Sequence, residues 1–152
     1  MQLAALTRPE LIFPQLPGTD RSSILRAFAE RLADQGSVHD ADELHQRLLE
    51  REELGSTAIG SGVAIPHCKL PDLEQVLLAV GIPAQGAVEF GAADQRPVEL
   101  FFLIVSPATE PAAHLRSLAA ISRWLKADEH VQRLLRHRDR ESIFAALQGD
   151  GD

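Results

Sequence analysis

The sequence predicts a three-layer α/β/α protein, in which a central sheet lies between two layers of helices. Two apolar runs in the middle of the chain, Leu77 to Ile82 and Val98 to Val105, are nearly continuous, which is typical of strands buried on both faces. Helical patterns flank this middle part, before Gly55 and after Thr109. A length of 152 residues with 45% hydrophobic content predicts one domain, 1–152, with a sizeable core.

Two helices are expected in the first third of the chain. Asp20 or Ser22 is suited to cap the first, and Gly36 is suited to end it. The second begins after Asp40, where Glu43 three residues later resembles a capping box, and Gly55 follows its last turn. Their apolar faces consist of Ile24, Leu25, Phe28 and Leu32 in the first helix and Leu44, Leu48 and Leu49 in the second.

The segment from Ser56 to Lys69 is rich in glycine and β-branched residues, so short strand pieces are expected there. These pieces lie at Ile59 and at 63–65, and Gly60 and Gly62 separate them. Further along, Val88 and Phe90 alternate with polar or small residues, which predicts a short edge strand or a hairpin arm.

The chain after the second apolar run is expected to be helical. A helix starts near Thr109 with Pro111 in its first turn, where the missing N–H of proline does no harm. Two shorter helices follow, and Asp139 is suited to cap the second of them.

Composition excludes several classes of function. The formal net charge of −7, with no clustered Lys and Arg, argues against nucleic-acid binding. No apolar stretch reaches the roughly 20 residues of a membrane helix, and no signal segment opens the chain, so we expect a cytoplasmic protein without membrane insertion. The single cysteine excludes an intrachain disulfide and any multi-cysteine metal cage. A phosphate site on so acidic a protein must create its own positive potential.

Two histidines stand out by their position. His67 follows Val63 to Pro66 and is therefore expected just past a strand end, where ligands bind in open α/β sheets. His114 is expected in the first turn of a helix that leaves a buried strand, where an anion is favoured. The two rings are expected to converge on one positive pocket. The alternative for each is a histidine that merely packs in place.

Three kinds of chemistry are open to such a pocket. A zinc site would have at most His67, Cys68 and His114 as ligands, without a CxxC or HxxxH spacing. A Cys68 nucleophile would need a histidine base, but adjacent residues of an extended segment point to opposite sides. A histidine nucleophile needs a neutral imidazole and donors for the transferred group, and Arg51, Thr57 and His114 can donate to phosphate. The third possibility is favoured.

Three segments of the chain carry a likeness to a known family, namely LLEREELGSTAIGSGVAIPHCKL, RPVELFFLIVSP and HLRSLAAISRWL. In these segments the chain resembles the type-2 enzyme IIA components of the bacterial phosphoenolpyruvate-dependent phosphotransferase system. The opening LTRPELIF and the closing RESIFAAL also look like the nitrogen-regulatory IIA subfamily. The likeness covers essentially the whole chain, although Cys68 stands where many relatives have glycine, and we expect it to be a small, partly buried side chain without a catalytic role.

The resemblance implies a fold and a set of roles. The fold is a mixed central sheet of about five strands flanked by helices. His67 matches the histidine that accepts phosphate from the phosphocarrier HPr or its nitrogen-branch counterpart, while His114 and Arg51 match the residues that stabilise the phosphoryl group. Thr57 is carried over more weakly as a hydroxyl donor. No cofactor is implied, because the sequence shows neither a Walker loop nor a metal-binding carboxylate pair.

The implied function is a phosphocarrier whose phosphorylation state regulates partner proteins such as transporters or sensor kinases. We expect no IIB or membrane IIC segment attached to it, which favours a regulator over a part of a sugar transporter. Two alternatives stay open: a fructose- or mannitol-specific IIA component, and a binding module that is not phosphorylated. The sequence also leaves open whether the chain forms a homodimer.

Overall fold

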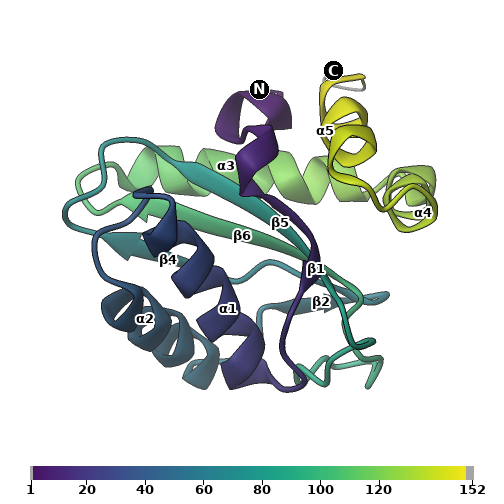
Figure 1. Cartoon of the computed structure of the whole chain (residues 1–152), viewed down its shortest axis with the longest axis horizontal. Coiled ribbons are helices and arrows are strands. Elements are labelled where there is room, and N and C mark those ends of the chain that lie inside the picture. Colours follow the sequence, from purple (N-terminus) through teal and green to yellow (C-terminus); the bar gives the residue numbers. More distant parts are fainter. Residues whose placement is uncertain (1, 150–152) are drawn as a thin grey trace.

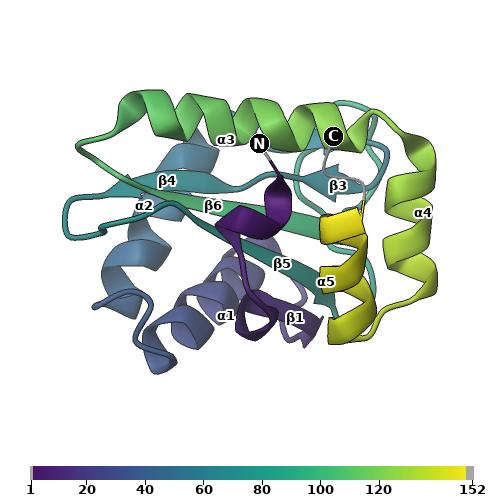
Figure 2. The ribbon, with the colours of Figure 1, turned by 90° about the horizontal axis from the view of Figure 1, so that it is seen from above.

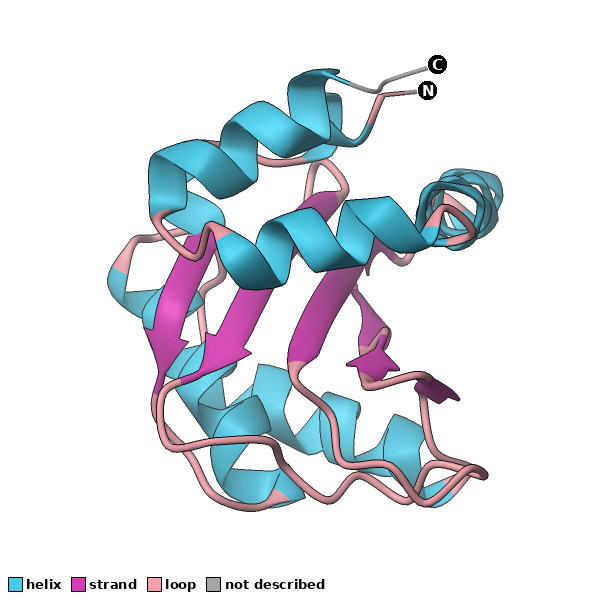
Figure 3. Ribbon diagram, turned by 90° about the vertical axis from the view of Figure 1, so that its right-hand side faces the viewer, coloured by secondary structure: helices cyan, strands magenta, loops and turns pink. Residues whose placement is uncertain are grey.

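The computed structural model describes residues 2–149 and has three layers, with a mixed sheet between two layers of helices (Figures 1 and 3). The helices are α1 (Arg21–Asp34), α2 (Ala41–Glu53), α3 (Pro111–Leu125), α4 (Asp128–Arg136) and α5 (Arg140–Gly149), and short 3₁₀ turns cover Leu3–Leu6 and Pro9–Leu11. The strands are β1 (Ile12–Leu16), β2 (Ala58–Gly60), β3 (Val63–Ala64), β4 (His67–Leu70), β5 (Leu77–Pro83) and β6 (Leu100–Pro107). The predicted α/β/α class and mixed sheet are confirmed.

The sheet has the strand order β1-β5-β6-β3-β2, and β4 also pairs with β6. The pairs β1–β5, β6–β3 and β6–β4 are parallel, whereas β5–β6 and β3–β2 are antiparallel. All eight residues of β6 are buried, as expected for a strand that is covered on both faces. This central strand is therefore the rigid element on which the rest of the sheet is built.

Each face of the sheet has its own hydrophobic core. Helices α1 and α2 cover one face, and α3 and α5 cover the other (Figures 1 and 3). The core between the sheet and helices α1 and α2 contains a cluster of aromatic rings. Phe28 and Phe90 each pack edge to face against Phe101, and Phe13 packs in the same way against Phe28. The opposite core includes Phe102, Ile121 and Trp124. Figure 2 shows α3 lying along the sheet, with α4 and α5 folded beside its far end.

The predicted helix boundaries agree with the caps that the structure shows. The Asp20 carboxylate accepts the Ser23 backbone N–H at 2.8 Å and so caps α1. The Asp40 carboxylate accepts from the N–H groups of Asp42 and Glu43 at the start of α2. Pro111 is at the first position of α3, and Asp139 accepts the Ser142 N–H at the start of α5.

The strand β1 is missing from the sequence-based prediction. Its sequence, IFPQL, contains Pro14, and proline in a strand removes a hydrogen-bond donor. The structure accommodates Pro14 because β1 lies at the edge of the sheet and its register with β5 shifts between Phe13 and Leu16. The residues 88–98 form only a single bridge, between Val88 and Val98, so the expected edge strand is reduced to one pair.

His67 lies just past the end of a strand, as expected, but it also begins a further strand that the sequence did not predict. Strand β3 ends at Ala64, and after Ile65 and Pro66 the chain continues along the same side of β6 as β4, whose first residue is His67. Pro66 interrupts the ladder because it has no N–H, but its carbonyl accepts the Ile104 N–H at 2.9 Å. His67 is therefore fixed to the central strand, opposite Ile104. Among the described residues, none of the helices is long and apolar enough to cross a membrane.

Candidate functional site

His67 has both ring nitrogens occupied in a defined way. Its Nδ1 lies 2.8 Å from the Ile65 carbonyl oxygen, and its Nε2 lies 3.2 Å from Nε of Arg51. A carbonyl can only accept and a guanidinium can only donate. Neutral His67 therefore carries its proton on Nδ1, and the lone pair of Nε2 is directed toward Arg51.

Arg51 comes from the last turn of α2 and has two anchors. Besides its Nε contact with His67, its Nη1 donates to the Gly55 carbonyl at 2.8 Å. This second bond holds the guanidinium plane beside the imidazole and leaves further N–H groups for an incoming anion. The structure thus brings Arg51 and His67 into direct contact.

His114 lies in the first turn of α3, and its ring lies close to that of His67 in the lining of the same pocket. Its ring centroid is 5.4 Å from that of His67, with an angle of 56° between the planes. The side chain is buried, and its Nδ1 lies 2.7 Å from the hydroxyl oxygen of Ser106, a fully buried residue of β6. Two histidines that are far apart in the sequence are therefore held close together, with their rings tilted, by the sheet and α3.

The environment favours the neutral form of both imidazoles. Burial is the main cause that lowers the pKa of His67, and the positive charge of Arg51 adds to it, whereas the Ile65 carbonyl acts in the opposite direction. Burial, followed by the proximity of His67 and Lys69, lowers the pKa of His114 to about 4. A neutral His67 has a free lone pair, which is the state a nucleophile requires.

These residues surround an open pocket of about 370 Å³, lined by Arg47, Glu50, Arg51, His67, Cys68, Lys69 and His114. Three of the lining side chains are cations and only one is an acid. On a chain with a net charge of −7, this pocket provides the local positive potential that a phosphate site needs.

Thr57 is not brought into this pocket. Its side chain is buried, its hydroxyl donates to the Glu52 carboxylate, and its backbone N–H donates to Glu52 Oε1 at 2.9 Å. The expectation of a hydroxyl donor to phosphate therefore does not agree with this arrangement. Glu52 is a buried residue of the site that was not predicted, although its position gives a signal, because it continues the spacing of Leu44 and Leu48 on the apolar face of α2.

Cys68 is not suited to act as a nucleophile. The side chain is half-buried against the core below α1 and α2. Burial raises the pKa of its thiol to about 12, so the reactive thiolate is scarce at neutral pH. This agrees with the expectation of a small, partly buried side chain.

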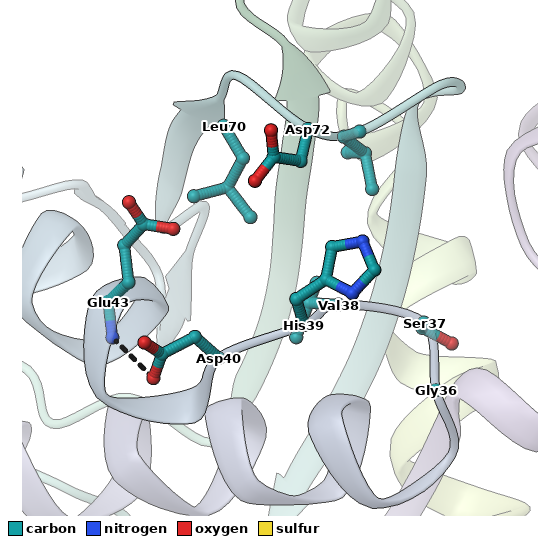
Figure 4. A pocket seen from close by; sticks show the side chains of 9 residues that line it. Gly36, Ser37, Val38, His39, Asp40, Glu43, Leu70 and Asp72 are labelled. Carbon is teal, nitrogen blue, oxygen red and sulfur yellow. Dashed lines mark hydrogen bonds between the residues drawn. The ribbon is translucent and has the colours of Figure 1, made fainter.

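Neither a metal site nor a second anion site finds support in the described part of the chain. Residues 2–149 contain no group of three or more His, Cys, Asp or Glu side chains placed to hold a metal ion. A second, smaller pocket lies where the α1–α2 connection approaches the end of β4, and Figure 4 shows Asp40, Glu43 and Asp72 around it. With three carboxylates and no Lys or Arg in its lining, that pocket is unsuited to an anion.

Comparison with known proteins agrees with the chemistry of the first pocket. Residues 5–149 match the family described as phosphoenolpyruvate-dependent sugar phosphotransferase system, EIIA 2. The chain belongs to this family. It is thus an EIIA type-2 phosphocarrier component.

Among the relatives of this EIIA domain is the nitrogen regulatory protein of Bradyrhizobium diazoefficiens, which is 36% identical over 149 residues, covering 97% of this chain and 95% of the relative. The crystal structure of nitrogen regulatory protein IIA-Ntr from Neisseria meningitidis superposes with a TM-score of 0.87 at 24% identity, covering 95% of this chain and 98% of that one.

A third comparison concerns a complex. The structure of enzyme IIA-Mtl bound to phosphorylated enzyme IIB-Mtl from Escherichia coli matches with a TM-score of 0.78 at 21% identity, covering 95% of this chain and 99% of that one. This comparison shows that the two proteins share a fold.

Proposed function

We propose that this EIIA domain, taken as the single domain 1–152, is the phosphocarrier of a nitrogen-related phosphotransferase system and accepts a phosphoryl group on His67 from an HPr-type donor. The observation that carries the proposal is the pair of contacts on His67. The Ile65 carbonyl occupies Nδ1 at 2.8 Å, which leaves Nε2 as the nucleophilic atom, on the side of the cationic pocket. The homology to nitrogen regulatory proteins supports the nitrogen branch.

The transfer step needs no general base. The Nε2 lone pair attacks phosphorus in the phosphohistidine of the donor, and the donor's N–P bond breaks with its electron pair going to the donor nitrogen. A new N–P bond forms at Nε2, which had no proton to lose. The His67 ring gains positive charge in this step, and the Ile65 carbonyl stabilises it by accepting Nδ1–H.

Two donors are placed to bind the oxygens of the phosphoryl group. Arg51, now in contact with Nε2, turns its N–H groups to an oxygen as the lone pair is used. His114 donates from Nε2 when the Ser106 hydroxyl donates to its Nδ1. In this arrangement the two histidines hold opposite tautomers, so one is a nucleophile and the other a hydrogen-bond donor. Thr57 is not included among the groups that bind the phosphoryl oxygens, because its hydroxyl donates a hydrogen bond to Glu52.

The test is incubation with phosphoenolpyruvate, enzyme I and an HPr-type protein, followed by intact mass measurement. We expect one acid-labile phosphoryl group on the wild type and none on His67→Ala. An unlabelled wild type would refute the proposal and would leave a binding module that is not phosphorylated. Equal labelling of His67→Ala would refute His67 as the acceptor and would place the phosphoryl group on another residue.

A second candidate is a sugar-specific IIA component, which is favoured by the structural likeness to the mannitol IIA protein. Onward transfer separates the two. Labelled protein that rapidly transfers its phosphoryl group to a fructose- or mannitol-type IIB protein supports the sugar role. Partners of the regulatory role, such as transporters or sensor kinases, would be captured by only one of the two forms, phosphorylated or unmodified.

A further inference from the structure

A buried carboxylate outside the pocket, Glu52, is connected to His67 through a series of hydrogen bonds. Glu52 is only 3% exposed, and both of its oxygens accept from one residue, Thr57, through the backbone N–H at 2.9 Å and through the hydroxyl. A carboxylate is costly to bury unless its oxygens accept hydrogen bonds. The pair therefore fixes Thr57 firmly to the end of α2.

Thr57 in turn fixes the segment that precedes His67. Its carbonyl accepts the Ile65 N–H at 3.0 Å. Ile65 is followed by Pro66, whose ring restricts the preceding residue to extended conformations, and the Pro66 carbonyl is bonded to β6. Ile65 is thus held on both sides, and its own carbonyl has a fixed direction.

That carbonyl is the one that accepts Nδ1–H of His67. We infer that Glu52 and Thr57 are positioning residues for the phosphoryl acceptor: by holding Ile65, they keep the proton of His67 on Nδ1 and the Nε2 lone pair in the pocket. The role of Glu52 and Thr57 in phosphoryl transfer rests on the proposed function, whereas their effect on the tautomer of His67 does not. The hydrogen bonds of Glu52 and Thr57 reach the reacting atom only through Ile65, and the charge of Glu52 additionally favours the protonated form of His67.

The first measurement is the tautomer of His67, read from the ¹⁵N chemical shifts of its ring nitrogens at neutral pH. We expect the wild type to be predominantly Nδ1–H. In Glu52→Gln, whose amide cannot accept from both Thr57 donors, the ratio of Nδ1–H to Nε2–H should fall by about fivefold. Glu53→Gln is the matched control, since it makes the same change on the exposed neighbouring residue and should leave the ratio unchanged.

The second measurement compares Thr57→Val with Thr57→Ser. The valine has nearly the shape of threonine without the hydroxyl, whereas the serine retains it. We expect Thr57→Val to lower the tautomer ratio and to slow labelling of His67 by about tenfold, and Thr57→Ser to restore both. Urea unfolding of each variant identifies the conditions in which it is folded, and the spectra are recorded there.

Three results would overturn the inference: a wild type that is mainly Nε2–H, a Glu52→Gln ratio equal to that of Glu53→Gln, or a Thr57→Val variant that is less stable but keeps the wild-type ratio. The last result would assign Thr57 a structural role only. A wild type with the expected tautomer that is never labelled would refute the proposed function and not the positioning role.

Discussion

Below pH 6.5 the buried His114 ring should weaken the folded protein, because the unfolded chain takes up a proton there that the folded state resists. The pKa of His114 falls from 6.5 to about 4 on folding. A histidine with a lowered folded pKa contributes its full stability above pH 6.5 and loses it as the pH falls toward 4. Stability should therefore rise with pH across this interval.

The size of the effect follows from the shift. Each pH unit corresponds to about 1.4 kcal/mol, which gives an upper limit of about 3 kcal/mol for this shift. His114 is 6% exposed, but the ring borders an open pocket where water screens part of the charge, so we expect about 2 kcal/mol between pH 7.5 and 4.5.

The assay is urea unfolding followed by circular dichroism at both pH values, for the wild type and for His114→Asn. Other groups titrate in both proteins, so the difference between the two proteins isolates His114. The wild type should lose about 2 kcal/mol more than the variant when the pH is lowered. Equal losses in both proteins would show that the His114 ring is not held neutral by its surroundings.

Four further results are expected at the site. Arg51→Lys should slow labelling of His67 about tenfold despite its retained charge, because an ammonium cannot reproduce both guanidinium contacts; equal rates would remove the Nε contact from the mechanism. Ser106→Ala should slow labelling about tenfold and shift the His114 tautomer while leaving that of His67 unchanged. Alkylation of Cys68 at pH 8 should be much slower than that of a free thiol, and Cys68→Ala should be labelled at the wild-type rate; rapid alkylation would contradict a pKa near 12. Phosphorylation of His67 should raise the pKa of His114, measurable by NMR titration, because a nearby anion favours the charged ring.

The sequence predicts those elements of the fold that depend on local chemistry. Asp20 and Asp40 cap helices where the pattern places them, and the apolar run of β6 is buried along its whole length. Strand β1 escapes prediction because a five-residue segment with an internal proline has little strand character of its own, and it becomes a strand only through its pairing with β5.

The candidate site, too, could be predicted only in part from the sequence. Position in the chain and family likeness pick out His67, His114 and Arg51, and the structure brings these three together. The protonation pattern of the rings could not be predicted, because it depends on Ile65 and Ser106, whose orientation is set by the sheet. Thr57 was expected to donate to phosphate because a hydroxyl next to a motif looks available for ligand binding until its acceptor is known, and that acceptor is Glu52.

The pairing of β4 has a consequence for association. In the described chain β4 pairs only with β6, so no strand pairs with its other edge, and such an edge is a common starting point for sheet extension between molecules. Arg47 donates to the Lys69 carbonyl on this edge at 3.5 Å, and Lys69 itself adds an exposed charge. The cations that attract a phosphoryl group therefore also discourage a second strand from adding to the sheet. Neutralising them would be expected to weaken phosphate binding and to promote self-association together.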